Sequence, residues 1–308
     1  MTVAAPRLAS HLVNGILSVK PLADFAKHQA RSMMIKRAES IGVYWREEVQ
    51  SLRSRQQAID FSPDWETELA QIVNPNLIYP DYYLRSFHAY EEGNLGWQPA
   101  MEVEVAARAV HARLWNEGAN GDARLRQSYH DRLKTQIPEP NDILDLGCSV
   151  GMSTFAIHDH YPHAQLTGVD LSPHFLAIAQ YRSLQRQLPV HWMHAPAEAT
   201  GLPDASFDLV SAFLLFHELP RMAAVSILQE ARRVLRPGGH LAIMEMNPKS
   251  EIYAAMPPYI LTLLKSTEPY LDDYFTFDIE NAIEDAGFTC PTQACNSPRH
   301  RTLIAQAR

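Results

Sequence analysis

Ile143-Leu144-Asp145-Leu146-Gly147-Cys148-Ser149-Val150-Gly151 decides the fold, because a short apolar strand here turns through glycines into a helix. A second strand, 165–170, ends at Asp170, twenty-three residues after Gly147. A glycine loop followed by a strand, an acidic residue and a helix at this distance is typical of nucleoside-binding sites. The glycines let a ligand approach the backbone, and the carboxylate accepts hydrogen bonds from both ribose hydroxyls.

Three better-known loop motifs do not fit this stretch. Residues 147–151 read G-x-S-x-G, which is not the dinucleotide fingerprint G-x-G-x-x-G. A nucleophile elbow also needs an oxyanion loop and an acid–histidine pair in order, and the position of Asp170 fits nucleoside binding instead. The chain contains no G-x-x-x-x-G-K-[ST], which excludes a P-loop NTPase.

Strands and helices alternate on the carboxyl side of the proline pair Pro138 and Pro140. This alternation predicts an α/β fold with a parallel, doubly wound sheet. The expected strands are 142–146, 165–170, 190–193, 207–213, 240–245, 288–294 and 300–307, and the expected helices begin after Gly151 and span 173–187, 222–235 and 278–287.

The region before the prolines is predicted to be mainly helical. We therefore divide the chain into a helical lid or substrate region, 1–137, and a nucleoside-binding domain, 138–308. The expected helices are 20–41, 44–58, 62–73, 99–117 and 122–135. Residues 74–98 form a long irregular stretch rich in aromatic residues, and such stretches in compact domains are often functional loops.

Composition excludes several classes of protein. The 308 residues are 46% hydrophobic and 20% charged, which is not the composition of a disordered chain. No apolar run is long enough to span a membrane, and the first 30 residues lack the apolar core of a secretory signal. Three cysteines cannot form a disulfide framework, so we expect a reduced, cytoplasmic protein. The net charge of −8 argues against nucleic-acid partners.

The charge is distributed unevenly along the chain. Residues 1–57 carry nine basic and four acidic residues, and apolar residues recur there at helical spacing between Leu22 and Ile41. Lys27 and Arg31 are expected on the polar face of this helix. The helix could rest on an anionic membrane or close over a site, although a helix packed on its own domain with a solvated basic face is the interpretation we favour.

Four motifs in order resemble the class I S-adenosylmethionine-dependent methyltransferases, particularly the small-molecule group typified by quinone C-methyltransferases. They are DLGCSVG at 145–151, VDLSP at 169–173, LPDASFDLV at 202–210 and RRVLRPGGHLAIME at 232–245. The resemblance implies a Rossmann-like, seven-stranded sheet with an antiparallel last strand. It also implies S-adenosyl-L-methionine as cofactor and S-adenosyl-L-homocysteine as product.

The resemblance also assigns cofactor-binding residues. Asp170 would hold the ribose, and Leu171 would pack on the adenine. The acidic residue that usually contacts the adenine amino group is replaced by Pro196, so Glu198 or the backbone of Ala197 would take that role. The remaining residues that we expect around the cofactor are Asp145, Gly147, Cys148, Ser149, Gly151 and Phe213.

Two histidines are the candidates for catalysis. Methyl transfer from a sulfonium is an in-line displacement that depends mainly on positioning, and a base is needed only if the acceptor must lose a proton. His217, at the end of the fourth strand, is the expected base, or else it lines the cofactor pocket. His88 lies among aromatic residues, as pocket chemistry often does. Neither H-E-x-x-H nor a metal ligand after this strand is present, so no metal is expected.

Aromatic residues outside the nucleoside-binding core are expected to bind the acceptor, and about half of them to pack as scaffold. The candidates for acceptor binding are Tyr82, Tyr90, Glu91, Trp97, Tyr259 and Tyr270. Pro257-Pro258-Tyr259 is interpreted as a loop.

Three functions remain open at this stage. The first is methyl transfer to oxygen or carbon of a small, apolar or aromatic acceptor. The second is a methyltransferase acting on RNA or protein, which the basic N-terminal helix keeps in consideration, and the third is a non-catalytic cofactor-binding protein. The acceptor and the oligomeric state are not determined by the sequence.

Overall fold

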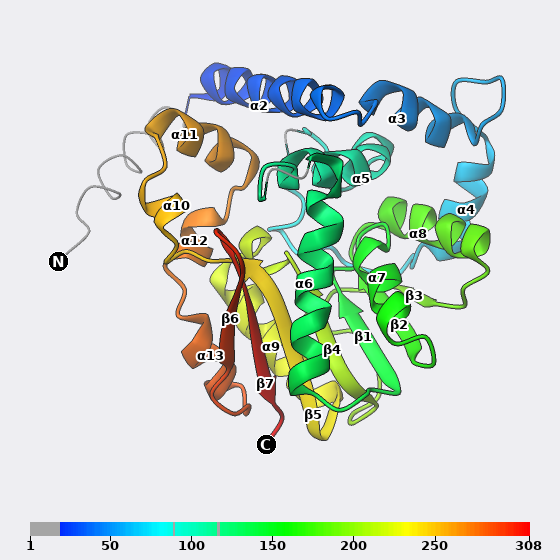
Figure 1. The fold of residues 1–308 in the computed structure, drawn as a ribbon. Helices are drawn as coiled ribbons and strands as arrows, with labels where there is room; N and C mark the ends of the chain where they lie inside the picture. The colour runs from blue at the N-terminus through cyan, green and yellow to red at the C-terminus, as the bar shows by residue number, and fades with distance from the viewer. Residues whose placement is uncertain (1–18, 89, 116–117) are drawn as a thin grey trace.

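The computed structural model describes residues 19–88, 90–115 and 118–308. Its centre is a seven-stranded sheet with the strand order β3-β2-β1-β4-β5-β7-β6 (Figure 1). The strands are β1 (Asp142–Leu146), β2 (Gln165–Asp170), β3 (His191–His194), β4 (Phe207–Phe213), β5 (Leu235–Met246), β6 (Thr292–Ser297) and β7 (His300–Gln306). Strands β1 to β5 pair in parallel, and β7 is antiparallel to both β5 and β6. This confirms the predicted fold class.

Helices surround the sheet and also cover one end of it (Figure 1). Before the sheet come α2 (Lys20–Ser40), α3 (Trp45–Ser54), α4 (Asp64–Ile72), α5 (Trp97–His111), the short 3-10 helix η1 (Gly118–Asn120) and α6 (Gly121–Gln136). Between strands lie α7 (Met152–His160), α8 (Pro173–Arg186), η2 (Phe216–Glu218) and α9 (Arg221–Val234). After β5 come α10 (Glu251–Ala254), α11 (Pro258–Thr267), α12 (Leu271–Phe275) and α13 (Ile279–Asp285).

The two faces of the sheet bury alternate side chains. In β1, Leu144 and Leu146 pack into the core under α9 and α13, whereas Ile143 packs into the core under α6. In β5, Leu241 packs into the core under α9 and α13, and Met244 packs into the core under α6. Successive strand residues point to opposite faces, so an apolar strand that is covered by helices on both sides needs nearly continuous hydrophobic residues.

Helix α6 packs directly on the sheet, although it belongs to the region before the prolines. Its Tyr129 and Leu133 are buried in the core under α6, and the Tyr129 hydroxyl donates to the carbonyl of Ala242 in β5. In its packing, α6 therefore belongs with the sheet. The division of the chain at residue 137 into a lid or substrate region and a nucleoside-binding domain stays a prediction.

The segment after β5 differs from the sequence expectation. Pro257-Pro258-Tyr259 was expected as a loop, but Pro258 is the first residue of α11 and Pro257 its N-cap. A proline suits the first helical turn because its missing N–H has no partner there in any case and its φ is already helical. The sixth strand also lies later than 288–294, at Thr292–Ser297.

Helix α2 turns Lys27 and Arg31 inward, which corrects the expectation that these two lie on a solvated face, whereas Lys20 and Lys36 of the same helix are exposed. Lys27 Nζ donates to Ser86 Oγ at 2.7 Å, and Arg31 forms an ion pair with the buried Glu102. The exposed apolar residues of α2 are Leu22, Phe25 and Met33. Among the described residues, none of the helices is long and apolar enough to cross a membrane. Residues 1–18 lie outside the described part of the chain.

Candidate functional site

A cavity of about 450 Å³ lies where β1, β2, β4 and β5 end and is covered by α2, α5 and α11. Its wall includes the loop after β1, the last residues of β2 and β4, and the last residue of β5, Met246. The carboxyl edge of a parallel sheet is the usual ligand site in this architecture, because the loops that follow neighbouring strands converge there.

Two glycines shape the loop after β1. Gly147 has a φ of +66°, and a Cβ at this position would lie 2.7 Å from the Leu215 side chain. Gly151 has a φ of +85° at the start of α7, and a Cβ there would lie 2.9 Å from the rings of Phe155 and Trp192. Any larger residue would therefore be strained at both positions.

Ser149 between these glycines adopts a left-handed conformation, with a φ of +51°. Its hydroxyl is buried, lines the cavity and has no hydrogen-bond partner among the described residues. Strained residues and orphaned polar atoms are characteristic of sites that bind a ligand.

Asp170 closes the loop from the end of β2. Its Oδ2 accepts a hydrogen bond from the backbone N–H of Ser149, and its Oδ1 accepts one from Ser172 N–H, both at 2.8 Å. Burial raises the pKa of Asp170 to about 7, and the two amide hydrogen bonds only partly oppose this shift. The carboxyl group thus titrates near neutral pH at the cavity wall.

Asp145 lies behind the loop. Its Oδ2 accepts hydrogen bonds from Ser153 and Thr154 of α7, both at 2.6 Å, while its Oδ1 is buried without a partner among the described residues. Burial raises the pKa of Asp145 to about 6. Asp145 is not part of the cavity wall, so it fixes the start of α7 against β1.

Glu198 stands where the loop after β3 reaches the cavity. Its Oε1 accepts a hydrogen bond from the Tyr82 hydroxyl at 2.5 Å, and its Oε2 is buried without a partner among the described residues. Ala197 and Leu171 line the wall beside it. The unused carboxylate oxygen can accept a hydrogen bond from a ligand amino group.

His217 is presented by η2, directly after β4. Leu214 has a φ of +59°, which turns the chain across the end of the sheet. Glu245, fully buried in β5, accepts from His217 Nδ1 at 2.9 Å and from the His217 backbone N–H at 3.1 Å. Burial alone would lower the pKa of His217, but Glu245 outweighs this effect and raises it to about 9. The imidazole is therefore cationic at neutral pH.

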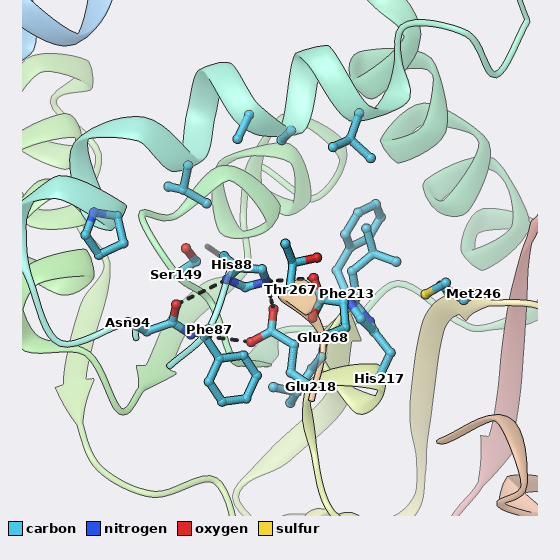
Figure 2. A pocket seen from close by; sticks show the side chains of 18 of the residues that line it. Phe87, His88, Asn94, Ser149, Phe213, His217, Glu218, Met246, Thr267 and Glu268 are labelled. Carbon is cyan, nitrogen blue, oxygen red and sulfur yellow. Dashed lines mark hydrogen bonds and ion pairs between the residues drawn. The ribbon is translucent and has the colours of Figure 1, made fainter. Parts of the chain in front are cut away.

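His88 joins three segments of the chain around one imidazole (Figure 2). Its Nε2 lies 3.1 Å from Glu218 Oε1 and 3.3 Å from Glu268 Oε1, and its Nδ1 lies 3.2 Å from Asn94 Oδ1. Burial would lower the pKa of His88, but the two carboxylates raise it to about 10. The backbone N–H of His88 also donates to the carbonyl of Thr267 at the end of α11.

Most residues that the sequence predicts for the site meet at this cavity. Its wall contains Tyr82, His88, Tyr90, Gly147, Cys148, Ser149, Asp170, Leu171, Ala197, Glu198, Phe213 and His217. Tyr90 contributes its ring only, because its hydroxyl donates to Glu102 at 2.5 Å. Gly151 is outside the wall and acts through the backbone at the start of α7.

Four of the predicted acceptor-binding residues are outside this wall, which corrects the sequence prediction. Glu91 is exposed, and Tyr259 is 66% exposed on α11. Trp97 begins α5, and its ring packs on Trp65. Tyr270 lies behind Tyr82, to whose carbonyl it donates a hydrogen bond. Aromatic residues near turns look alike in sequence, and only the packing of the helices separates them.

Several residues of the site were missed in the sequence. Glu218 follows His217, Glu245 is the penultimate residue of the apolar strand β5, and both are carboxylates in otherwise hydrophobic stretches. A charged residue within a hydrophobic stretch was the sequence signal that could have identified both. Asn94 and Glu268 gave no local signal, because they reach His88 only through the folding of distant segments.

The roof of the cavity is mostly apolar. Its residues come from α2, α5, α10–α11 and the turn between the last two, and they include Ala30, Met33, Met34, Val103, Ala106, Val110, Tyr253, Met256, Ile260 and Leu263. An apolar cavity with a few convergent polar groups is the usual form of a small-molecule site.

Comparison with known proteins agrees with this geometry. A family model described as a methyltransferase domain matches residues 143–239. A demethylmenaquinone methyltransferase from Thermus thermophilus is 35% identical over 149 residues, which are 48% of this chain and 65% of that relative. Residues 143–239 thus form a methyltransferase domain. The matched part of several other curated methyltransferases is about half of their own length.

Two solved structures share the fold of this methyltransferase domain. An O-methyltransferase candidate from Nostoc punctiforme has a TM-score of 0.56 at 16% identity, covering 86% of this chain and 73% of that one. Phosphoethanolamine N-methyltransferase 2 of Haemonchus contortus, in complex with S-adenosyl-L-methionine, has a TM-score of 0.52 at 15% identity, covering 71% and 61%. Identities this low show a common fold only.

The residues present fit S-adenosyl-L-methionine, the cofactor of class I methyltransferase domains. The glycine loop leaves room beside the backbone, and the orphaned Ser149 hydroxyl and Glu198 oxygen offer polar partners. The acidic groups on this side, including Asp170, suit a ligand that carries a sulfonium and an ammonium group. In the part of the chain that the structure describes, no group of three or more His, Cys, Asp and Glu side chains could hold a metal ion.

Proposed function

We propose that this protein transfers the methyl group of S-adenosyl-L-methionine to an oxygen or carbon atom of a small acceptor with an apolar or aromatic body. The observation that supports this most is the continuity of the cavity. One wall is the glycine loop with Asp170, and the same space extends to His217 and to the apolar roof.

The cofactor, when bound, supplies an already activated methyl group. The chain then has to bind, orient and shield the two reactants, and such positioning accounts for most of the rate enhancement. Asp170 and Ser149 are proposed to hold the ribose and methionyl side, and Glu198 the adenine amino group. Leu171 and Phe213 provide apolar contacts beside them.

We propose that His217 binds the reacting oxygen of the acceptor. Glu245 holds Nδ1, so Nε2 is the nitrogen left to face a ligand. With its pKa raised to about 9, the imidazole is charged at neutral pH and donates a hydrogen bond to a phenolate or enolate oxygen. This replaces the role of general base with that of a cation that favours the ionised acceptor.

His88 is proposed to order the acceptor side of the cavity. Its contacts to Glu218 and Glu268 connect η2 to the end of α11. They therefore fix the position of the roof relative to the ends of the strands. A large polymer would have to displace these helices, because α2, α5 and α11 all cover the cavity. The roof therefore favours a small acceptor over RNA or protein.

The test is calorimetric titration with S-adenosyl-L-homocysteine, followed by turnover of S-adenosyl-L-methionine with a panel of phenols, quinones and β-dicarbonyl compounds. We expect micromolar product binding and turnover with an acceptor that ionises. Binding without turnover on any acceptor would support a cofactor-binding protein, and no binding would contradict the proposal. Transfer to RNA or protein would contradict the small acceptor.

A further inference from the structure

Two arginines face the cavity on the side of β5 and β7. Arg37 is on α2, and Arg299 is in the turn between β6 and β7. Each has a buried Nε without a hydrogen-bond partner in the part of the chain that the structure describes. Arg299 donates from a terminal nitrogen to the Val110 carbonyl at 2.9 Å, and no ion pair of either arginine with a described residue is present. Two guanidinium groups thus share one cavity wall.

The carboxylates nearby are already bound to other side chains. Asp122 accepts from His111 at 2.7 Å and from Arg126 at 2.9 Å. Glu245 accepts a hydrogen bond from His217 Nδ1 at 2.9 Å. Neither carboxylate is free to neutralise the two arginines.

Both arginine side chains are half-buried. Charges that are partly removed from water are normally paired in proteins. Burial and the positive charges of Arg113 and Arg299 lower the pKa of Arg37, so these charges repel one another. Arg31, six residues earlier on the same helix, shows the usual arrangement, with Glu102 as its partner. A ligand that carries negative charge would satisfy the donors of Arg37 and Arg299.

We propose that Arg37 and Arg299 bind an anionic group of the acceptor, a carboxylate or a phosphate monoester, at the end of the cavity away from Asp170. This inference rests on the proposed function, because it describes the acceptor of the same reaction. The apolar body of the acceptor would lie along Met34, Val110 and Tyr253, which line the same wall. Its reacting atom would then reach His217. Guanidinium groups suit both anions, since each offers paired N–H donors to two oxygens.

The test measures binding and not turnover. The protein is titrated with 2-naphthoate, with 2-naphthyl phosphate and with the neutral isostere 2-naphthamide, each with and without saturating S-adenosyl-L-homocysteine. Comparing the first two probes distinguishes a carboxylate site from a phosphate site. The titrations are repeated on Arg37→Gln, Arg299→Gln and the control Lys36→Gln, which removes one charge from an exposed position on the same helix.

We expect at least one anion to bind about tenfold or more tightly than the amide, and either arginine variant to lose most of that difference. The Lys36→Gln control should keep the full difference in affinity between the anion and the amide. The titration with S-adenosyl-L-homocysteine shows separately that each variant is folded and keeps its cofactor site, while the turnover assay above tests the proposed function. Equal affinity for anion and amide, or anion binding that survives in Arg37→Gln and Arg299→Gln, would overturn the inference even if the cofactor product binds normally.

Discussion

His217 Nδ1 lies 2.9 Å from Oε1 of Glu245, across the ends of the neighbouring strands β4 and β5. The same carboxylate also accepts the backbone N–H of His217, so it fixes both the ring and the short helix η2 that carries it. Because Glu245 is fully buried, the imidazole keeps its proton well above neutral pH. The pair places a protonated imidazole, held by a carboxylate, in the wall of the cavity.

Replacing His217 by glutamine should lower kcat/KM about tenfold to hundredfold, because a charged donor to the acceptor oxygen is lost. In the parent protein, kcat/KM should fall above about pH 9, where His217 loses its proton. The glutamine variant should lack this alkaline decline. A pH–rate profile of both proteins checks the prediction, and a rise in rate through pH 9 in the parent would show that His217 acts as a base.

The affinity for S-adenosyl-L-homocysteine should depend on the ionisation of Asp170. Its pKa of about 7 means that the carboxylate is mostly protonated at pH 6 and mostly ionised at pH 8, so affinity should be about tenfold tighter at pH 8. Asp170→Asn should bind weakly at both pH values. The control is Asp159→Asn, on the exposed side of α7. Calorimetry at the two pH values would contradict the prediction if Asp170→Asn kept the same pH dependence.

Stability without ligand should decrease between pH 7 and pH 10. The folded-state pKa values of His88 and His217, about 10 and about 9, exceed the ordinary value of 6.5. The folded protein therefore retains protons that the unfolded chain has released, and the free energy of unfolding falls as pH rises. Thermal unfolding should show a lower Tm at pH 9.5 than at pH 7. His88→Gln should reduce this difference, whereas exposed His28→Gln should not.

The ion pair between Arg31 and Glu102 should hold α2 over the cavity. Arg31→Ala leaves a carboxylate with a side chain only 5% exposed and should lower the free energy of unfolding by about 1–3 kcal/mol. Amide hydrogen exchange along α2 should become faster. Arg46→Ala, which removes a 77% exposed charge on α3, is the matched control. Unchanged exchange in α2 would show that its packing on α11 is sufficient.

The sheet could be predicted because its signals are local. Apolar strands such as 142–146, glycine turns and the proline at the start of α8 each act within a few residues. The predicted cofactor site has the same local basis, since Gly147 directly follows β1 and Asp170 ends the adjacent parallel strand β2. The sequence left the adenine contact open between Glu198 and the backbone of Ala197; in the structure Glu198 accepts a hydrogen bond from Tyr82 and keeps one buried oxygen without a partner among the described residues.

The acceptor side could not be predicted to the same extent, because its contacts join distant segments. Tyr259 and Trp97 were chosen for their aromatic rings, but helix packing turns one to solvent and the other toward Trp65. Lys27 and Arg31 were expected on a solvated basic face, but α2 packs on α5 and α11 and turns them toward Ser86 and Glu102. Whether a side chain faces water or a cavity depends on which surface its helix meets, and the spacing along the helix does not specify that.

The roof formed by α2 and α11 comes from residues 20–40 and 258–267, on either side of the stretch 143–239 that matches the methyltransferase domain (Figure 1). The part proposed to bind the methyl donor is thus continuous in the gene, while the part proposed to meet the acceptor is encoded in flanking pieces. Evolution can therefore exchange those pieces and change the acceptor without rebuilding the donor half. Grafting the flanking segments of a related enzyme onto this sheet is accordingly a route to new acceptor specificity.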